Sequence, residues 1–182
     1  MPRVIQVLRA PPPLAALHCA VEYRALVEDW IQRFKYPPRG LAGLDPAPRA
    51  VLEQLVRASA ARLPAPAPQL VVPVPLHPRR LRQRGFNPAC LLARAVAREV
   101  GTRCNPIALR RLRDTPSQTK LDRSARRRNV RNAFETRAPM PEVVWLVDDV
   151  VTTGSTLAEC ARVLKRAGAR RVVGVCAAWT PP

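Results

Sequence analysis

Apolar residues in the first third of the chain recur at helical spacing. Between residues 22 and 34 they fall three or four positions apart, which predicts an amphipathic helix. The prolines and the glycine of residues 35–40 end that helix, and a second helix is expected from about residue 47 to residue 62. Residues 1–20 show no regular alternation and are expected to be irregular.

The hydrophobic period changes after residues 63–69, a segment rich in proline and alanine that indicates a boundary. Beyond it, short runs of β-branched and apolar residues alternate with stretches of helical spacing. Strands are expected in the segments that begin at Gln69, Asn105, Glu142 and Arg170. Helices are expected at about 88–101 and 155–168, and the arginine-rich segment 79–84 is interpreted as a loop.

This order of elements predicts an α/β fold in two parts. Residues 1–63 are expected to form a small N-terminal helical segment, and residues 64–182 an α/β domain with a parallel twisted sheet flanked by helices. In such sheets ligands bind at the carboxyl ends of the strands. The polar residues that follow the strand predicted at 142–147 are therefore the first candidates for a functional site.

The charge balance adds a second indication of function. The net formal charge is +18, from 31 Lys and Arg against 13 Asp and Glu. Such an excess favours polyanionic partners, either nucleic acid or phosphorylated metabolites. Because nearly every base is arginine, and alanine and proline are also abundant, a GC-rich genome is an alternative explanation of the same excess.

The distribution of apolar residues argues for a folded protein outside membranes. Hydrophobic residues make up 47% of the chain, which is enough for a core. No apolar run approaches the roughly 18 residues of a membrane span, and prolines at positions 11–13 interrupt the N-terminus. We therefore expect no signal peptide, no membrane insertion and a cytoplasmic location.

The stretch VVWLVDDVVTTGST, residues 143–156, carries the strongest chemical signal. Its loop of small residues leads into a helix that starts near Ser155, where unpaired N–H groups and the helix dipole attract anions. Gly154 allows the backbone to approach a phosphate closely, and the neighbouring hydroxyls donate hydrogen bonds to it. The candidate phosphate-binding residues are Val151, Thr152, Thr153, Gly154, Ser155 and Thr156.

Two adjacent acids, Asp148 and Asp149, stand directly before this loop. Carboxylates would repel the phosphate, so they are expected to face something else: vicinal sugar hydroxyls or a metal ion. A ligand of the ribose 5-phosphate type, with a phosphate at one end and a diol nearby, fits both features. In the alternative interpretation the two acids cap a helix and Ser155 is a plain N-cap residue.

The same stretch resembles the motif by which type I phosphoribosyltransferases bind 5-phosphoribosyl 1-diphosphate (PRPP). Two further blocks, VPVPLHPRRLRQRGFNPACLLA and LRRLRDTPSQTKLDRSARRRNVRNAF, together with the KY pair at 35–36, resemble the competence-associated ComF family. The resemblance covers roughly residues 22–180 and implies a type I phosphoribosyltransferase-like fold.

The resemblance also implies roles for individual residues. Asp148 and Asp149 would hold the ribose hydroxyls, and residues 152–156 the 5-phosphate. The diphosphate would lie at the loop formed by Leu76, His77, Arg79 and Arg80. Mg²⁺ would enter with PRPP and could also touch the two acids, and the segment around Lys120 would cover the site.

Arg79, Arg80 and Lys120 are the candidates for a catalytic role, because they could neutralise the departing diphosphate. For each single arginine a solvated surface charge is the alternative. His77 contacts phosphate in one interpretation and caps or packs in the other.

Two departures from the resembled families are visible in the sequence. ComF-like proteins commonly carry an N-terminal four-cysteine zinc module, whereas only Cys19 stands in that region here, beside His18. The module is therefore expected to be absent or truncated away. Purine-salvage enzymes of the superfamily have an acid inside the motif loop, where this chain has Thr152, which argues against a purine handled through such an acid.

Two functions remain open from the sequence. The first is a transferase that uses PRPP, Mg²⁺ and an unknown nitrogenous acceptor. The second is a non-catalytic protein that senses PRPP or nucleotides and binds single-stranded DNA during DNA uptake. Aromatic residues make up only 4%, and Phe86 and Phe134 are the best placed to stack on bases. The candidate contacts to a nucleic-acid backbone are Arg82, Arg84, Arg126, Arg127 and Arg128.

Overall fold

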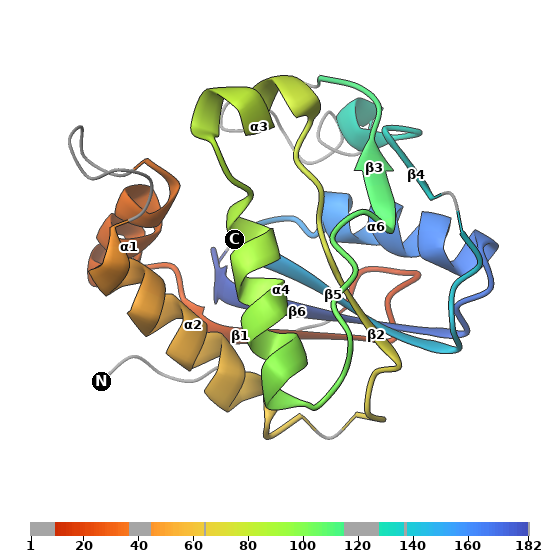
Figure 1. The fold of residues 1–182 in the computed structure, drawn as a ribbon, viewed down its shortest axis with the longest axis horizontal. Coiled ribbons are helices and arrows are strands. Elements are labelled where there is room, and N and C mark those ends of the chain that lie inside the picture. The colour runs from red at the N-terminus through yellow and green to blue at the C-terminus, as the bar shows by residue number, and fades with distance from the viewer. Residues whose placement is uncertain (1–9, 37–44, 64, 115–127, 137, 182) are drawn as a thin grey trace.

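The computed structural model describes residues 10–36, 45–63, 65–114, 128–136 and 138–181. At its centre lies a four-stranded sheet in the order β1-β6-β5-β2, in which every pairing is parallel. The strands span Ala16–Glu22 (β1), Leu70–Pro73 (β2), Val143–Val151 (β5) and Arg171–Trp179 (β6). The expected parallel sheet flanked by helices is confirmed (Figure 1).

Helices cover both faces of this sheet. On one face pack α1 (Ala25–Lys35), α2 (Pro46–Ala60) and α4 (Pro88–Glu99), which meet Trp145 and Val147 of β5. On the other face packs α6 (Ser155–Arg166), which meets Val144 and Leu146. Alternate residues of β5 therefore belong to opposite halves of the core, as expected for a strand buried on both sides.

A small second sheet accompanies α6. It consists of the antiparallel strands β3 (Leu109–Arg111) and β4 (Phe134–Thr136), and their inward residues join the same half of the core as α6. The sequence predicts a strand in the region of β3 but not β4, because three residues are too few to show a period. Most of the chain between the two strands lies outside the described residues.

The expectation that residues 1–20 are irregular is wrong for the last five of them. Residues 16–22, ALHCAVE, form β1, which pairs with β6 from Ala16 opposite Val173 to Glu22 opposite Trp179. The strand escapes a search for alternation because it is buried on both faces, so even His18 is only 2% exposed. The division between residues 63 and 64 stays a prediction, although β1 contributes to the same sheet as the later strands.

The arginine-rich segment expected as a loop is instead a short helix, α3 (Pro78–Arg84). Pro78 occupies the first turn, where its missing N–H costs nothing, and the side chain of His77 accepts a hydrogen bond from Arg79 N–H at 3.3 Å. Gly85, with φ of 82°, ends the helix in the left-handed conformation. The residues at its two ends therefore indicate this helix. It has no buried residue, so its sequence shows no periodic pattern of apolar positions.

The turn between β5 and α6 is shaped by Gly154, which precedes α6 with φ of 72°. A Cβ at this position would lie 2.7 Å from Cγ of Pro11, so the N-terminal segment packs directly on the turn. No helix among the described residues is long and apolar enough to cross a membrane.

We predict that Gly154→Ala destabilises the protein more than Gly85→Ala. Both glycines have positive φ, which costs a residue with Cβ about 1 kcal/mol or more. Only the Gly154 variant also meets another atom, since nothing lies within 4 Å of a Cβ built at Gly85. Urea unfolding should show the larger loss for Gly154→Ala, by about 1 kcal/mol, as for other overpacked sites.

Pro11→Ala provides the control for that comparison, because it removes the atom that the new methyl group would meet. In this background the two glycine variants should cost nearly the same. Equal costs in the wild-type background would show instead that Pro11 does not press on the turn in solution.

Candidate functional site

The two acids lie at the carboxyl end of β5, beyond the point where β2 stops pairing with it. β2 pairs with β5 only as far as Pro73 opposite Val147, while β6 continues to the end of β5. The acids therefore belong to the strand, and the expectation that the strand ends before them is wrong. Their position at the ligand edge of the sheet is as expected.

The carboxylates have different partners. An oxygen of Asp148 accepts a hydrogen bond from the N–H of Asp149 at 2.9 Å. In Asp149, Oδ1 accepts from the N–H of Val150 at 2.7 Å, and Oδ2 lies 3.0 Å from Nζ of Lys35. Lys35 is the last residue of α1, so the N-terminal helices supply a cation to the site.

The different partners shift the two pKa values in opposite directions. Burial, and then repulsion by the Asp149 carboxylate, raise the pKa of Asp148 well above its ordinary value. Burial also acts to raise the pKa of Asp149, but attraction to the Lys35 ammonium and hydrogen bonds to it outweigh this effect, so that pKa is lowered. The two neighbouring carboxylates are therefore in different electrostatic environments.

The loop after the acids forms a small network of hydroxyls. Oγ of Ser155 lies 2.9 Å from Oγ1 of Thr153, and the N–H of Ser155 points at the same Thr153 oxygen at 3.4 Å. Gly154, not Ser155, is the N-cap residue of α6, so the alternative in which Ser155 is a plain cap is wrong. Thr152 is exposed, whereas Thr153 and Thr156 are partly buried.

Val151 differs from the other residues of the motif. Its side chain is 4% exposed and belongs to the core, and its carbonyl oxygen accepts a hydrogen bond from the N–H of Thr180 at 2.9 Å. It helps to fix the turn from the end of β5.

The bases of the first turn of α3 gather around one acid that sequence reasoning missed. Asp114, beyond the end of β3, lies 3.6 Å from Arg79, 3.5 Å from Arg80 and 3.9 Å from Nδ1 of His77. Of the two interpretations of His77, the capping one is confirmed by its hydrogen bond to Arg79 N–H. No local sequence pattern marks Asp114 as a site residue, because it reaches α3 only through the tertiary fold.

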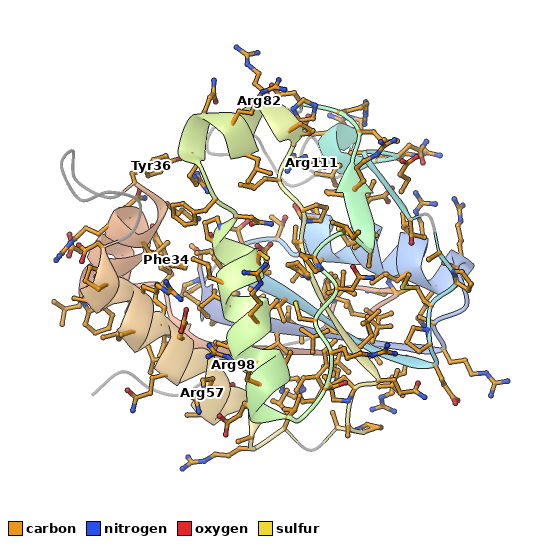
Figure 2. All side chains as sticks on the ribbon, in the orientation of Figure 1. Phe34, Tyr36, Arg57, Arg82, Arg98 and Arg111 are labelled. Atoms are coloured by element: carbon orange, nitrogen blue, oxygen red, sulfur yellow. The ribbon has the colours of Figure 1, made fainter. Side chains whose placement is uncertain are left out.

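The end of α3 meets the end of α1. Arg84 donates a hydrogen bond to the hydroxyl of Tyr36 at 2.8 Å, and its guanidinium lies 4.7 Å from the centre of the Tyr36 ring. The Phe34 and Phe86 rings lie 6.1 Å apart. Figure 2 shows Phe34 and Tyr36 between α1 and the segment that joins α3 to α4.

Arg111 on β3 belongs to the arginine-rich segment 110–113, which the sequence suggests for contacts to a phosphate backbone, but its side chain is buried. Its guanidinium lies 5.4 Å from the ring centre of Phe134, and the residue is 7% exposed (Figure 2). Burial, followed by the positive charge of Arg80, lowers its pKa. Arg111 also lines a cavity of about 670 Å³ between α3, α4 and β3, whose other lining residues include Leu76 and Phe86.

The residues predicted to contact nucleic acid differ in their exposure to solvent. Phe134 is 5% exposed and packs in the core, so the expectation that it stacks on nucleic-acid bases is wrong. Phe86 is partly exposed, and Arg82 and Arg128 are exposed. Lys120, Arg126 and Arg127 lie outside the described residues. Among the described residues, no group of three or more His, Cys, Asp or Glu side chains could hold a metal ion.

Comparison with known proteins identifies relatives of the chain. No protein-family model matches it. The DNA utilization protein YhgH of Salmonella typhi is 35% identical over 170 residues, which cover 93% of this chain and 74% of that protein. Competence protein F of Haemophilus influenzae is 33% identical over 146 residues, covering 78% of this chain and 63% of its own.

Among solved structures, adenine phosphoribosyltransferase of Leishmania tarentolae is 13% identical, with a TM-score of 0.45 over 94% of each chain. The sequence relatives share most of their length with the present chain. This protein therefore belongs to the ComF family, which includes competence protein F and the DNA utilization protein YhgH.

Proposed function

We propose that the protein binds PRPP with Mg²⁺ and transfers its phosphoribosyl group to a nitrogenous acceptor. One observation carries the proposal: a pair of acids and a loop of hydroxyls and N–H groups follow each other on a single strand–turn–helix unit. The acids suit the diol of a ribose, and the start of α6 suits its 5-phosphate. Membership of the ComF family agrees with a phosphoribosyltransferase-like role.

The ionised state of Asp149 suits a role in binding the ribose hydroxyls. Lys35 keeps Asp149 ionised, and an ionised carboxylate accepts hydrogen bonds from two neighbouring hydroxyls. The phosphate would be held by N–H groups of the first turn of α6 and by the hydroxyls of Thr153 and Ser155.

The diphosphate would lie towards the start of α3. His77 stands at the end of the segment that leaves β2, and Arg79 and Arg80 follow in the first turn of the helix. In the transfer, the bond between the anomeric carbon and the diphosphate oxygen breaks, and the acceptor nitrogen bonds to that carbon. The arginines would stabilise the negative charge that accumulates on the departing diphosphate.

Mg²⁺ is expected to enter as part of the substrate, bound to the diphosphate. Carboxylate oxygens are ligands that Mg²⁺ accepts, so Asp148 and Asp149 are the described residues that could touch it. When bound, the metal supplies positive charge to the leaving group.

We predict that Asp148→Asn and Asp149→Asn each weaken Mg²⁺–PRPP binding about tenfold or more. The loss corresponds to a charged hydrogen bond, worth about 1.5–3 kcal/mol. Titration calorimetry of each variant beside the wild type measures the effect. Glu142→Gln serves as the control, because it removes an acid at the opposite, exposed end of β5.

Normal binding in the control and loss in both variants would support the site. Absence of Mg²⁺–PRPP binding by the wild-type protein would contradict the proposed function. Binding that survives in both aspartate variants would place the ligand elsewhere on the protein.

A second candidate function, single-stranded DNA binding, is favoured by the names of the relatives, a DNA utilization protein and a competence protein. The described residues that suit a phosphate backbone include Arg128 and the exposed arginines of α3: Arg79 is 68% exposed at its side chain, and Arg82 is also exposed. Such binding would use charge and little stacking, because Phe134 is buried.

For this second function we predict that Arg79→Gln and Arg82→Gln together weaken binding of an oligothymidine at low salt. They should also reduce the slope of log affinity against log salt by about 0.7 for each lost phosphate contact. Fluorescence anisotropy between about 50 and 200 mM salt measures both quantities. Arg170→Gln, a change at an exposed arginine next to β6, is the control. A DNA affinity independent of salt would rule this function out.

A further inference from the structure

Three consecutive residues at the end of α1 each contact a different part of the site. The Phe34 ring, 1% exposed, faces the ring of Phe86. Lys35 reaches Asp149 on β5, and Tyr36 accepts the hydrogen bond from Arg84 on α3. The end of α1 is therefore fixed on both sides of Lys35, which restricts where its ammonium group can lie.

The pair formed by Lys35 and Asp149 is shielded from water. The side chain of Lys35 is 22% exposed and that of Asp149 is 12% exposed, with 3.0 Å between Nζ and Oδ2. Screening by solvent is weak for such a pair, and removing one partner leaves the other charge partly buried and uncompensated. This contact differs in kind from the exposed ion pairs elsewhere on α1, such as Arg33 with Asp29.

The contact also fixes the orientation of the Asp149 carboxylate. Because Val150 N–H holds one oxygen and Lys35 holds the other, rotation of the carboxylate would break one of the two interactions. Each of these oxygens still has a lone pair that can accept a further hydrogen bond. The acid is thus oriented before any ligand binds.

We propose that Lys35 is a positioning residue that, through Asp149, makes the site select sugar phosphates with a vicinal diol over their deoxy analogues. The inference rests on the proposed function, and it makes the N-terminal helix α1 part of ligand recognition. It concerns the orientation of one carboxylate and requires no contact between Lys35 and the ligand.

The selection follows from the cost of leaving a polar group unpaired. When the carboxylate is fixed, a sugar without one hydroxyl leaves one of the remaining lone pairs of the carboxylate without a partner. When the carboxylate can rotate, it can adjust to the remaining hydroxyl, so the two sugars differ less. A fixed acid therefore discriminates between the sugars, and a rotating one does so weakly.

The test compares the affinities for ribose 5-phosphate and 2-deoxyribose 5-phosphate, measured by calorimetry without metal. The wild type should prefer the ribose compound by about tenfold, the value of one hydrogen bond to a charged group. Lys35→Met should reduce the preference to about threefold or less, mainly by weakening the binding of ribose 5-phosphate. Lys35→Arg should restore part of the preference, since it keeps the cation.

A double-mutant cycle assigns the effect to Asp149. If Lys35 acts through this acid, Lys35→Met should change the preference little in a protein that already carries Asp149→Asn. Lys165→Met on the exposed side of α6 controls for the loss of one positive charge, and it should leave the preference unchanged. If Lys35→Met does not fold, Lys35→Gln replaces it in the same comparison, because this variant also lacks the positive charge.

The outcomes separate the two proposals. A wild-type protein that binds neither sugar phosphate overturns this inference, whereas the proposed function falls only if Mg²⁺–PRPP also fails to bind. If Asp149→Asn abolishes the preference while Lys35→Met keeps it, the site stands and the role of Lys35 is overturned. If Lys35→Met weakens both sugars equally, Lys35 has only a structural role, which also overturns the inference.

Discussion

The pairing of β5 with β6 beyond the end of β2 is the constraint on which the site depends. Up to Val147, β5 has a neighbour on each side and lies between two layers of helices. Past that residue β2 no longer pairs with β5, and the backbone N–H groups of Asp149 and Val150 donate hydrogen bonds to the carboxylates of Asp148 and Asp149. The same strand is thus a core element along most of its length and carries the acids of the candidate site at its last residues.

Charge compensation around that strand end comes from distant parts of the chain. Lys35 comes from α1, whereas Asp114, beyond β3, gathers His77 and the first arginines of α3. Acids and bases are therefore paired near the carboxyl edge of the sheet. A cluster of bare cations would attract any anion, whereas this arrangement presents both signs of charge, as a ligand with a diol and phosphates requires.

The sequence predicted the parts of this protein that have a strong local pattern. The buried strands β5 and β6, the helices α1, α2, α4 and α6, and the grouping of acids with the small loop all follow from periodicity and residue type. Strand β1 and helix α3 were missed because one is buried on both faces and the other has no buried residue. The roles of Lys35 and Asp114 could not be assigned, since tertiary contacts alone bring them to the site.

The place of β1 has a consequence for how the chain folds. Among the residues that the structure describes, β1 pairs with β6 alone, and Ala16 lies opposite Val173. Such a contact closes the whole segment between β1 and β6 into one loop, and contacts between residues so distant in sequence form slowly. During synthesis, β1 cannot pair with β6 until β6 has left the ribosome. Until then the apolar residues of β1, among them Leu17, Cys19 and Val21, which are buried in the folded protein, lack their partner strand.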